Sequence, residues 1–143
     1  MTDTSKVTFP NRLAKLQKND ITHPLERQIQ KKILRCLRFN GIYAYPSKCV
    51  GIPDKKAKGG LRKAPVKGIP DITGFFDQRR YPALKGVAVY VEVKRPKEPL
   101  TFHQQLFLES AKTAGCFAMV AHSTEEVEAE MKKWTEPKLP NTQ

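Results

Sequence analysis

The chain has 143 residues, of which 39% are hydrophobic, so it is long enough for one domain with a single core and too short for two. Its net charge is +12 and its pI is near 9.8, which favours a polyanionic partner because binding releases the counterions condensed on phosphates. An anionic membrane surface is the competing partner, but no stretch has the strongly amphipathic pattern that it would need. We therefore expect a nucleic-acid partner and no membrane contact.

The three cysteines, Cys36, Cys49 and Cys116, are widely spaced and form no CxxC pair. This pattern indicates reduced thiols rather than a disulfide framework or a zinc site. The N-terminus has no secretory signal pattern, and no apolar run approaches the length of a membrane span. We expect a soluble, cytoplasmic protein.

Three regions are predicted along the chain: a flexible basic arm at residues 1–20, one domain at 21–135 and a tail at 136–143. The arm could contact phosphate or could simply be a frayed terminus. The domain is expected to begin with a helix that has Thr22 or His23 as its cap and Pro24 at its first position, and that stops at Asn40-Gly41. Its buried stripe would consist of apolar residues that recur every four positions, Leu25, Ile29, Ile33 and Leu37.

Glu26 is the only acid between Thr22 and Gly41. It lies in the first turn beside the buried stripe, so it could point along the edge of the core. Equally, an acid at this position could do no more than complement the helix dipole.

Residues 47–70 form a basic loop that we expect to contact phosphate. Glycines and prolines are frequent in it and argue against a regular element. Its single acid, Asp54, stands against seven basic residues: Lys48, Lys55, Lys56, Lys58, Arg62, Lys63 and Lys67. A charge run is often only a solvated surface, but this one leads directly into the turn before Asp71.

Two strands are predicted after the basic loop, Asp71 to Phe76 and Val87 to Lys94, the second ending before Pro96. Because alternate residues of a strand share a face, Glu92 and Lys94 should project together, opposite to the valines at 87, 89, 91 and 93. Antiparallel pairing of the two strands would bring Asp71 beside Glu92. An acid pair and an amine are thus expected at one edge of a sheet.

The rest of the chain predicts a helix capped by Thr101 and ended by Gly115, a buried strand from Phe117 to Ala121 and a last helix capped by Ser123. The inward face of the first of these helices would be Gln104, Phe107, Leu108, Ala111 and Ala114, and the last helix would pack Val127, Met131 and Trp134. Thr101 and Gln104 fit a capping box, which would account for Gln104 without any chemistry. His103 is kept as a possible substrate contact. The predicted fold is a mixed α/β layer.

Two carboxylates at a sheet edge suit a hard divalent cation. Phosphodiester hydrolysis needs an activated water and charge to offset the developing phosphorane, and Mg²⁺ held by Asp71 and Glu92 would supply both. The backbone carbonyl of Val93 is a natural third oxygen ligand. Lys94 could orient or deprotonate the attacking water.

Asp71 followed by Glu92-Val93-Lys94 resembles the signature of the PD-(D/E)xK nuclease superfamily. Over roughly residues 25–127 the sequence is similar to the VRR-NUC family, the virus-type replication-repair nucleases. The motifs that carry this resemblance are Gly68-Ile69-Pro70-Asp71, then Glu92-Val93-Lys94, then Gln104-x-x-Phe107. The resemblance implies a restriction-endonuclease-like fold, a mixed sheet flanked by helices.

For individual residues, the resemblance implies metal ligation by Asp71 and Glu92, a catalytic role for Lys94 and support of the site by Gln104. It implies a site role for Glu26, which is also a candidate metal ligand. Gly68 and Pro70 would shape the turn that presents Asp71. The basic loop is not part of the signature.

The resemblance also implies function. Stand-alone members of this size, often encoded by phages, act as homodimers that cut branched DNA such as Holliday junctions. We therefore expect an Mg²⁺- or Mn²⁺-dependent endodeoxyribonuclease for branched or flapped duplexes, with the apolar residues of the last helix or of the strand at 117–121 as candidate dimer surfaces. The alternatives are a non-catalytic DNA-binding module and a restriction-like enzyme that reads a base sequence, although no sequence-reading motif is visible.

Overall fold

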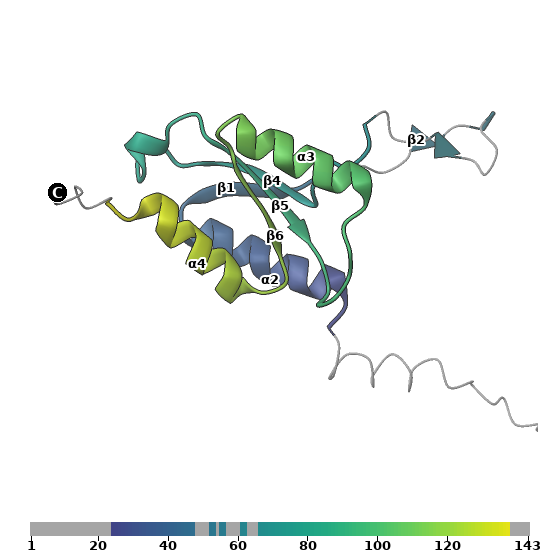
Figure 1. Ribbon diagram of the computed structural model, residues 1–143, viewed down its shortest axis with the longest axis horizontal. Coiled ribbons are helices and arrows are strands. Elements are labelled where there is room, and N and C mark those ends of the chain that lie inside the picture. Colours follow the sequence, from purple (N-terminus) through teal and green to yellow (C-terminus); the bar gives the residue numbers. More distant parts are fainter. Residues whose placement is uncertain (1–23, 48–51, 54, 57–60, 63–65, 138–143) are drawn as a thin grey trace, which may run out of the picture.

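The computed structural model describes residues 24–47, 52–53, 55–56, 61–62 and 66–137 (Figure 1). The helices are α2 (Glu26–Phe39), the 3-10 turn η1 (Pro82–Leu84), α3 (Phe102–Thr113) and α4 (Thr124–Thr135). The strands are β1 (Ile42–Pro46), β2 (Ile52–Pro53), β3 (Leu61–Arg62), β4 (Ile72–Phe76), β5 (Ala88–Val93) and β6 (Phe117–Ala121).

Four strands form one mixed sheet in the order β1-β4-β5-β6. The β1–β4 and β4–β5 pairs are antiparallel, and β5 pairs with β6 in parallel through the crossover helix α3. The short strands β2 and β3 pair separately in a hairpin that projects away from the main sheet (Figure 1). The expectation that residues 47–70 hold no regular element was therefore wrong at this hairpin, where four residues pair despite the surrounding glycines and prolines.

Helices cover both faces of the sheet. Figure 1 shows α3 on one side and α2 with α4 on the other. The main core lies between the sheet and the α2–α4 pair, and Val89, Val91 and Val93 of β5 are completely buried in it. Alternate residues of β5 face α3 instead, where the Tyr90 ring meets Phe107 edge to face. The predicted division of β5 into a valine face and a face with Glu92 is confirmed.

The start of α2 differs from the prediction. Its cap is Leu25, and Gln28 Oε1 accepts a hydrogen bond from the Leu25 backbone N–H at 3.1 Å. A glutamine in the first turn thus replaces the expected side-chain cap, and Pro24 precedes the helix instead of opening it. Thr22 and His23 lie outside the described residues. At the other end, Asn40 and the left-handed Gly41 (φ 82°) end the helix as predicted.

The later elements match their predicted bounds closely. Thr101 and Ser123 cap α3 and α4, and Val127 and Met131 are buried. Ala114 was wrongly placed on the inward face of α3: it follows the last helical residue and is exposed. No described helix is long and apolar enough to cross a membrane. The predicted arm at 1–20 and most of the predicted tail lie outside the described residues.

Candidate active site

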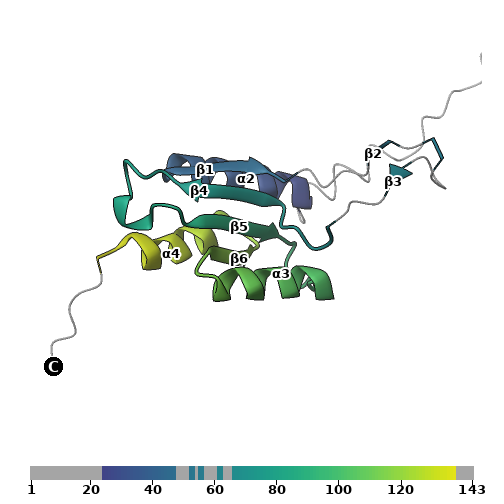
Figure 2. The same cartoon turned by 90° about the horizontal axis from the view of Figure 1, so that it is seen from above.

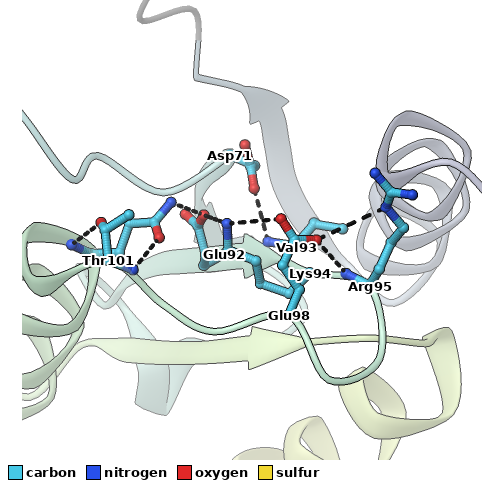
Figure 3. A network of polar contacts seen from close by, with 8 residues as sticks. Asp71, Glu92, Val93, Lys94, Arg95, Glu98 and Thr101 are labelled. Carbon is cyan, nitrogen blue, oxygen red and sulfur yellow. Dashed lines mark hydrogen bonds and ion pairs between the residues drawn. The ribbon is translucent and has the colours of Figure 1, made fainter.

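Asp71 stands immediately before β4, at the end of the sheet where the basic loop returns. The β4–β5 register pairs Ile72 with Val91, and continuing it by one residue sets Asp71 opposite Glu92. The Asp71 carboxylate Oδ2 accepts a hydrogen bond from the Val93 backbone N–H at 2.9 Å (Figure 3). Its backbone carbonyl accepts two more, from the Ser47 N–H and from Gln30 Nε2. Asp71 is therefore fixed by β5, by α2 and by the residue that follows β1.

The turn before Asp71 packs directly against the first turn of α3. Gly68 has φ 78°, and a Cβ at this position would lie only 2.2 Å from the His103 carbonyl oxygen. Both the backbone conformation and the space therefore require glycine. Pro70 is fully buried next to it. This contact couples the turn that presents Asp71 to the helix that presents Gln104.

Glu92 is the most deeply buried acid of the described chain, with 2% of its surface exposed. Its Oε1 accepts a hydrogen bond from Gln104 Nε2 and lies 3.6 Å from Lys94 Nζ, whereas its Oε2 is buried without a hydrogen-bond partner. Burial, followed by the negative charge of Asp71, raises the pKa of Glu92 to about 7 from the usual 4.5. The site therefore holds a carboxylate whose negative charge is poorly compensated.

Gln104 completes the capping box of α3 and contacts Glu92 at the same time. Its Oε1 accepts the Thr101 backbone N–H at 2.9 Å, while its own backbone N–H donates to Thr101 Oγ1. This capping box directs the side-chain N–H₂ group toward Glu92. The two interpretations of Gln104 from the sequence, cap and site residue, are thus both compatible with its geometry.

Lys94 lies on the Glu92 side of the sheet, and only 8% of its surface is exposed. Its Nζ lies between two acids, 3.6 Å from Glu92 Oε1 and 3.9 Å from Glu98 Oε1 (Figure 3). Glu98 was missed by the sequence analysis. It is held in the turn after β5 by its own N–H to the Arg95 carbonyl and by Oε2 accepting from the Arg95 N–H. The available signal was an acid four residues after Lys94 across a proline-containing turn.

Glu26 opens α2 and is partly buried. Its pKa is raised, first by burial and then by the charge of Asp71, while Lys94 opposes the shift. The carboxylate is therefore within electrostatic range of the cluster. No hydrogen bond joins it to Asp71, Glu92 or Lys94.

The residues present fit a hard cation with an incomplete protein shell. Among the described residues, no three His, Cys, Asp or Glu side chains form a ready metal cage. Asp71 and the partnerless oxygen of Glu92 can supply two ligands, and the Val93 carbonyl a third. Mg²⁺ usually retains several waters and binds through one or two carboxylates, so this donor set suits it. Glu26 could contribute through such a water.

The predicted phosphate contacts are only partly described. Lys55, Lys56 and Lys67 are exposed, and Arg62 belongs to β3. Lys48, Lys58 and Lys63 lie outside the described residues. His103 is exposed in the first turn of α3, with its ring 5.6 Å from that of Phe102. Its role as a substrate contact stays a prediction.

A mixed sheet flanked by helices, with an acid entering one strand and a Glu-x-Lys triplet ending the next, defines a PD-(D/E)xK-type nuclease domain. The model of the VRR-NUC domain matches residues 8–125, most of the chain. The chain therefore belongs to the VRR-NUC family, and it is a nuclease that acts on DNA. No curated protein and no solved structure matches it.

Proposed function

We propose that this nuclease is an Mg²⁺- or Mn²⁺-dependent endodeoxyribonuclease that hydrolyses phosphodiester bonds in branched duplexes, such as Holliday junctions or flaps. The observation that carries the proposal is the buried, partnerless Oε2 of Glu92 beside Asp71 and Lys94. A pure binding module has no use for such a cluster, since buried acids repel phosphate.

Asp71 and Glu92 would hold the cation, with the Val93 carbonyl as a third ligand. When bound, the cation would offset the negative charge of the phosphorane and of the departing 3′ oxygen. Gln104 donates to Glu92 and so keeps that carboxylate in one orientation. Lys94, held near Glu92 and Glu98, would orient the attacking water or accept its proton.

The proposal includes a homodimer, because a two-fold enzyme matches a two-fold junction. One of the two candidate dimer surfaces is unsuitable. Val127 and Met131 of α4 are buried in the core, and Trp134 packs against it, so the apolar face of this helix is already covered. The apolar residues Phe117 and Ala121 of β6 are buried in the core as well, so only the backbone edge of this strand stays a candidate, since the sheet ends there.

The test is cleavage of a panel of four-way junctions, flaps, nicked duplexes and linear duplexes with Mg²⁺, with Mn²⁺ and with EDTA, mapping each cut. We expect metal-dependent cuts near the branch point. Lys94→Ala should abolish cleavage and still shift the same DNA in a gel. Lys112→Ala, which removes an exposed lysine near the end of α3, is the matched control and should cleave normally. Equal cleavage of linear and branched duplexes would contradict the branch preference, and cleavage in EDTA would contradict the metal requirement.

A further inference from the structure

The sheet face that carries the acidic site continues into an uncovered aromatic surface. Tyr43 and Tyr45 of β1 and Phe75 of β4 are each about half exposed (51%, 51% and 49%), and we call these three residues the aromatic face. Helix α3 lies over β5 and β6, near the edge of the sheet that is opposite to the β1 edge (Figure 2). The aromatic face therefore has no covering element among the described residues.

The strand register makes the aromatic face and the acidic site one continuous surface. Across the sheet, Tyr43 lies opposite Phe75, and Tyr45 lies opposite Thr73. Because alternate residues of a strand share a face, Asp71, two residues before Thr73, lies on the same face of the sheet as Thr73 and Phe75. With a rise of about 3.3 Å per residue, Phe75 is only about 13 Å along the strand from Asp71. A strand of DNA with a phosphate at the site can therefore reach the rings with its next nucleotides.

The geometry of the aromatic face suits flat rings. The Tyr43 and Phe75 rings are stacked, with centroids 5.1 Å apart and planes 11° from parallel. A hollow of about 820 Å³ over the sheet is lined by all three aromatic residues, by Arg79 and by Asp77, whose Oδ1 lies 3.4 Å from Arg79 Nε. An adjoining hollow of about 560 Å³ shares these rings and Asp77 and is lined by Arg38, whose Nε donates a hydrogen bond to the Ala44 carbonyl at 2.8 Å and whose other guanidinium nitrogens would contact phosphate. Rings flanked by cations are the combination that binds single-stranded nucleic acid.

We propose that the aromatic face stacks unpaired bases of the DNA substrate while Arg38 and Arg79 contact the adjoining phosphates. This inference rests on the proposed function, because it assumes that a branched or flapped substrate presents unpaired bases at the site. Stacking needs no particular base, since every base has a π-face, so the surface would select for DNA structure rather than for sequence. It would thus contribute to a preference for branches without any sequence-reading element.

A second copy of the chain fits this surface less well. Fully buried aromatic side chains contribute about 150–250 Å² each, so three half-exposed rings offer only about 300 Å². A stable interface needs about 800 Å² from each partner. A two-fold contact would also bring Arg38 and Arg79 of both copies close together, whereas a DNA strand brings phosphates to them.

The experiment compares two DNA arms on one protein. A duplex carries a single-stranded arm of about eight nucleotides, either of thymidines or of abasic residues with the same phosphates. Binding is measured without metal in the Lys94→Ala background, which prevents cleavage. The second protein adds Tyr43→Ala and Phe75→Ala, and the control adds Phe39→Ala, which removes an 84% exposed ring at the end of α2. Circular dichroism and sedimentation establish folding and oligomeric state.

We expect the Lys94→Ala parent to bind the abasic arm on the order of tenfold more weakly than the thymidine arm. The Tyr43→Ala/Phe75→Ala variant should bind both arms equally, and the Phe39→Ala control should behave as the parent. Equal binding of both arms by the parent would overturn the inference, and this comparison needs no change in the aromatic face. If the Tyr43→Ala/Phe75→Ala variant became monomeric and still bound the two arms with a tenfold difference, the inference would be wrong and the aromatic face would be an interface between two copies of the chain. Failure of the proposed function would appear separately, as no cleavage of any branched duplex by the chain with Lys94 intact.

Discussion

One face of one sheet carries two regions of opposite character. At one end, Glu92 and Lys94 are almost completely buried. Gln104 of α3 donates to Glu92 Oε1 and Glu98 in the turn after β5 lies near Lys94 Nζ, but Glu92 Oε2 has no hydrogen-bond partner. At the other end, Tyr43 and Phe75 are half exposed and their rings stack on each other. The polar residues are inside and the aromatic residues are outside, the reverse of the usual arrangement.

The position of α3 explains this reversal. Gln104 in its first turn reaches Glu92, so that end of the sheet is withdrawn from water and the pKa of Glu92 rises. The rings on β1 and β4 lie beyond the helix. A buried negative charge is stabilised by a bound cation, whereas exposed aromatic rings offer a surface on which a ligand can stack. Changes at the first region should therefore affect turnover most, and changes at the second should affect binding.

The largest effect is expected from removing a charge at the acidic end. Asp71→Asn and Glu92→Gln should each reduce turnover on the order of 10³-fold or more, because a neutral amide is a poor ligand for a hard cation. DNA binding should stay intact or become tighter, since less negative charge faces the phosphate. Single-turnover cleavage and gel shifts measure the two effects. Glu130→Gln on α4 is the control, and normal cleavage by either site variant would refute the assignment of metal ligands.

A smaller loss of cleavage rate is expected when the hydrogen bond that orients the Glu92 carboxylate is removed. Gln104→Ala should reduce cleavage about 10- to 100-fold, the usual range for residues that orient a metal ligand. Its neighbour Gln105, which is exposed and bonded to Glu109, provides the matched control Gln105→Ala. Thr101→Ala removes the Oγ1 that caps the Gln104 N–H but keeps the backbone N–H that binds Gln104 Oε1, so it should cost about 1 kcal/mol of stability with little loss of cleavage. If Thr101→Ala and Gln104→Ala reduced cleavage equally, Gln104 would act only as a cap.

The pH dependence of the free energy of unfolding tests directly whether the charge of the buried Glu92 carboxylate is poorly compensated. The pKa of Glu92 is raised to about 7 in the fold from 4.5, so its stabilising contribution is complete below pH 4.5 and is lost as the pH rises through 7. Between pH 5 and 8 in EDTA, the protein should lose on the order of 2 kcal/mol relative to Glu92→Gln. Urea unfolding of both proteins measures this difference. A constant difference across the range would contradict the raised pKa, and Mg²⁺ should stabilise only the protein with Glu92 at pH 8.

The acidic region was predictable because strand alternation is local. A valine at every second position of β5 is enough to place Glu92 and Lys94 on the other face, and one antiparallel turn is enough to bring Asp71 opposite Glu92. The caps at Thr101 and Ser123 were equally visible, because a cap and the backbone N–H that it binds lie only three residues apart.

The aromatic face could not be predicted from the same rules. Alternation places Tyr43 and Tyr45 on one side of β1, but their exposure depends on how far α3 extends across the sheet, which is a matter of tertiary packing. Glu98 was missed for a similar reason: the turn after β5 folds back toward Lys94 with Lys97 in a left-handed conformation (φ 67°). The acid four residues after Lys94 is visible in the sequence, but the spacing alone does not specify that the turn brings it back to the lysine.

The smallest effect is expected from the basic loop, which would add phosphate contacts to both regions without distinguishing them. Replacing Lys55, Lys56 and Lys58 together by Ala should weaken binding of every DNA and reduce the slope of log K against log salt by up to about 3, since each phosphate contact releases about 0.9 counterion. Lys58 lies outside the described residues, so its inclusion rests on the sequence alone. Titrations at several salt concentrations measure the slope.

A charge-matched variant separates local contact from net charge. Exposed lysines near the ends of α3 and α4 provide it: Lys112, Lys132 and Lys133. If the loop contacts phosphate, the slope of log K against log salt should fall more in the loop variant than in this control. The reason is that counterion release depends on direct neutralisation of phosphates and not on the total charge of the protein. The loop variant should also weaken the thymidine and abasic arms equally, unlike the change at Tyr43 and Phe75. An unchanged salt slope would make the loop a solvated surface and leave the sheet face as the main DNA contact.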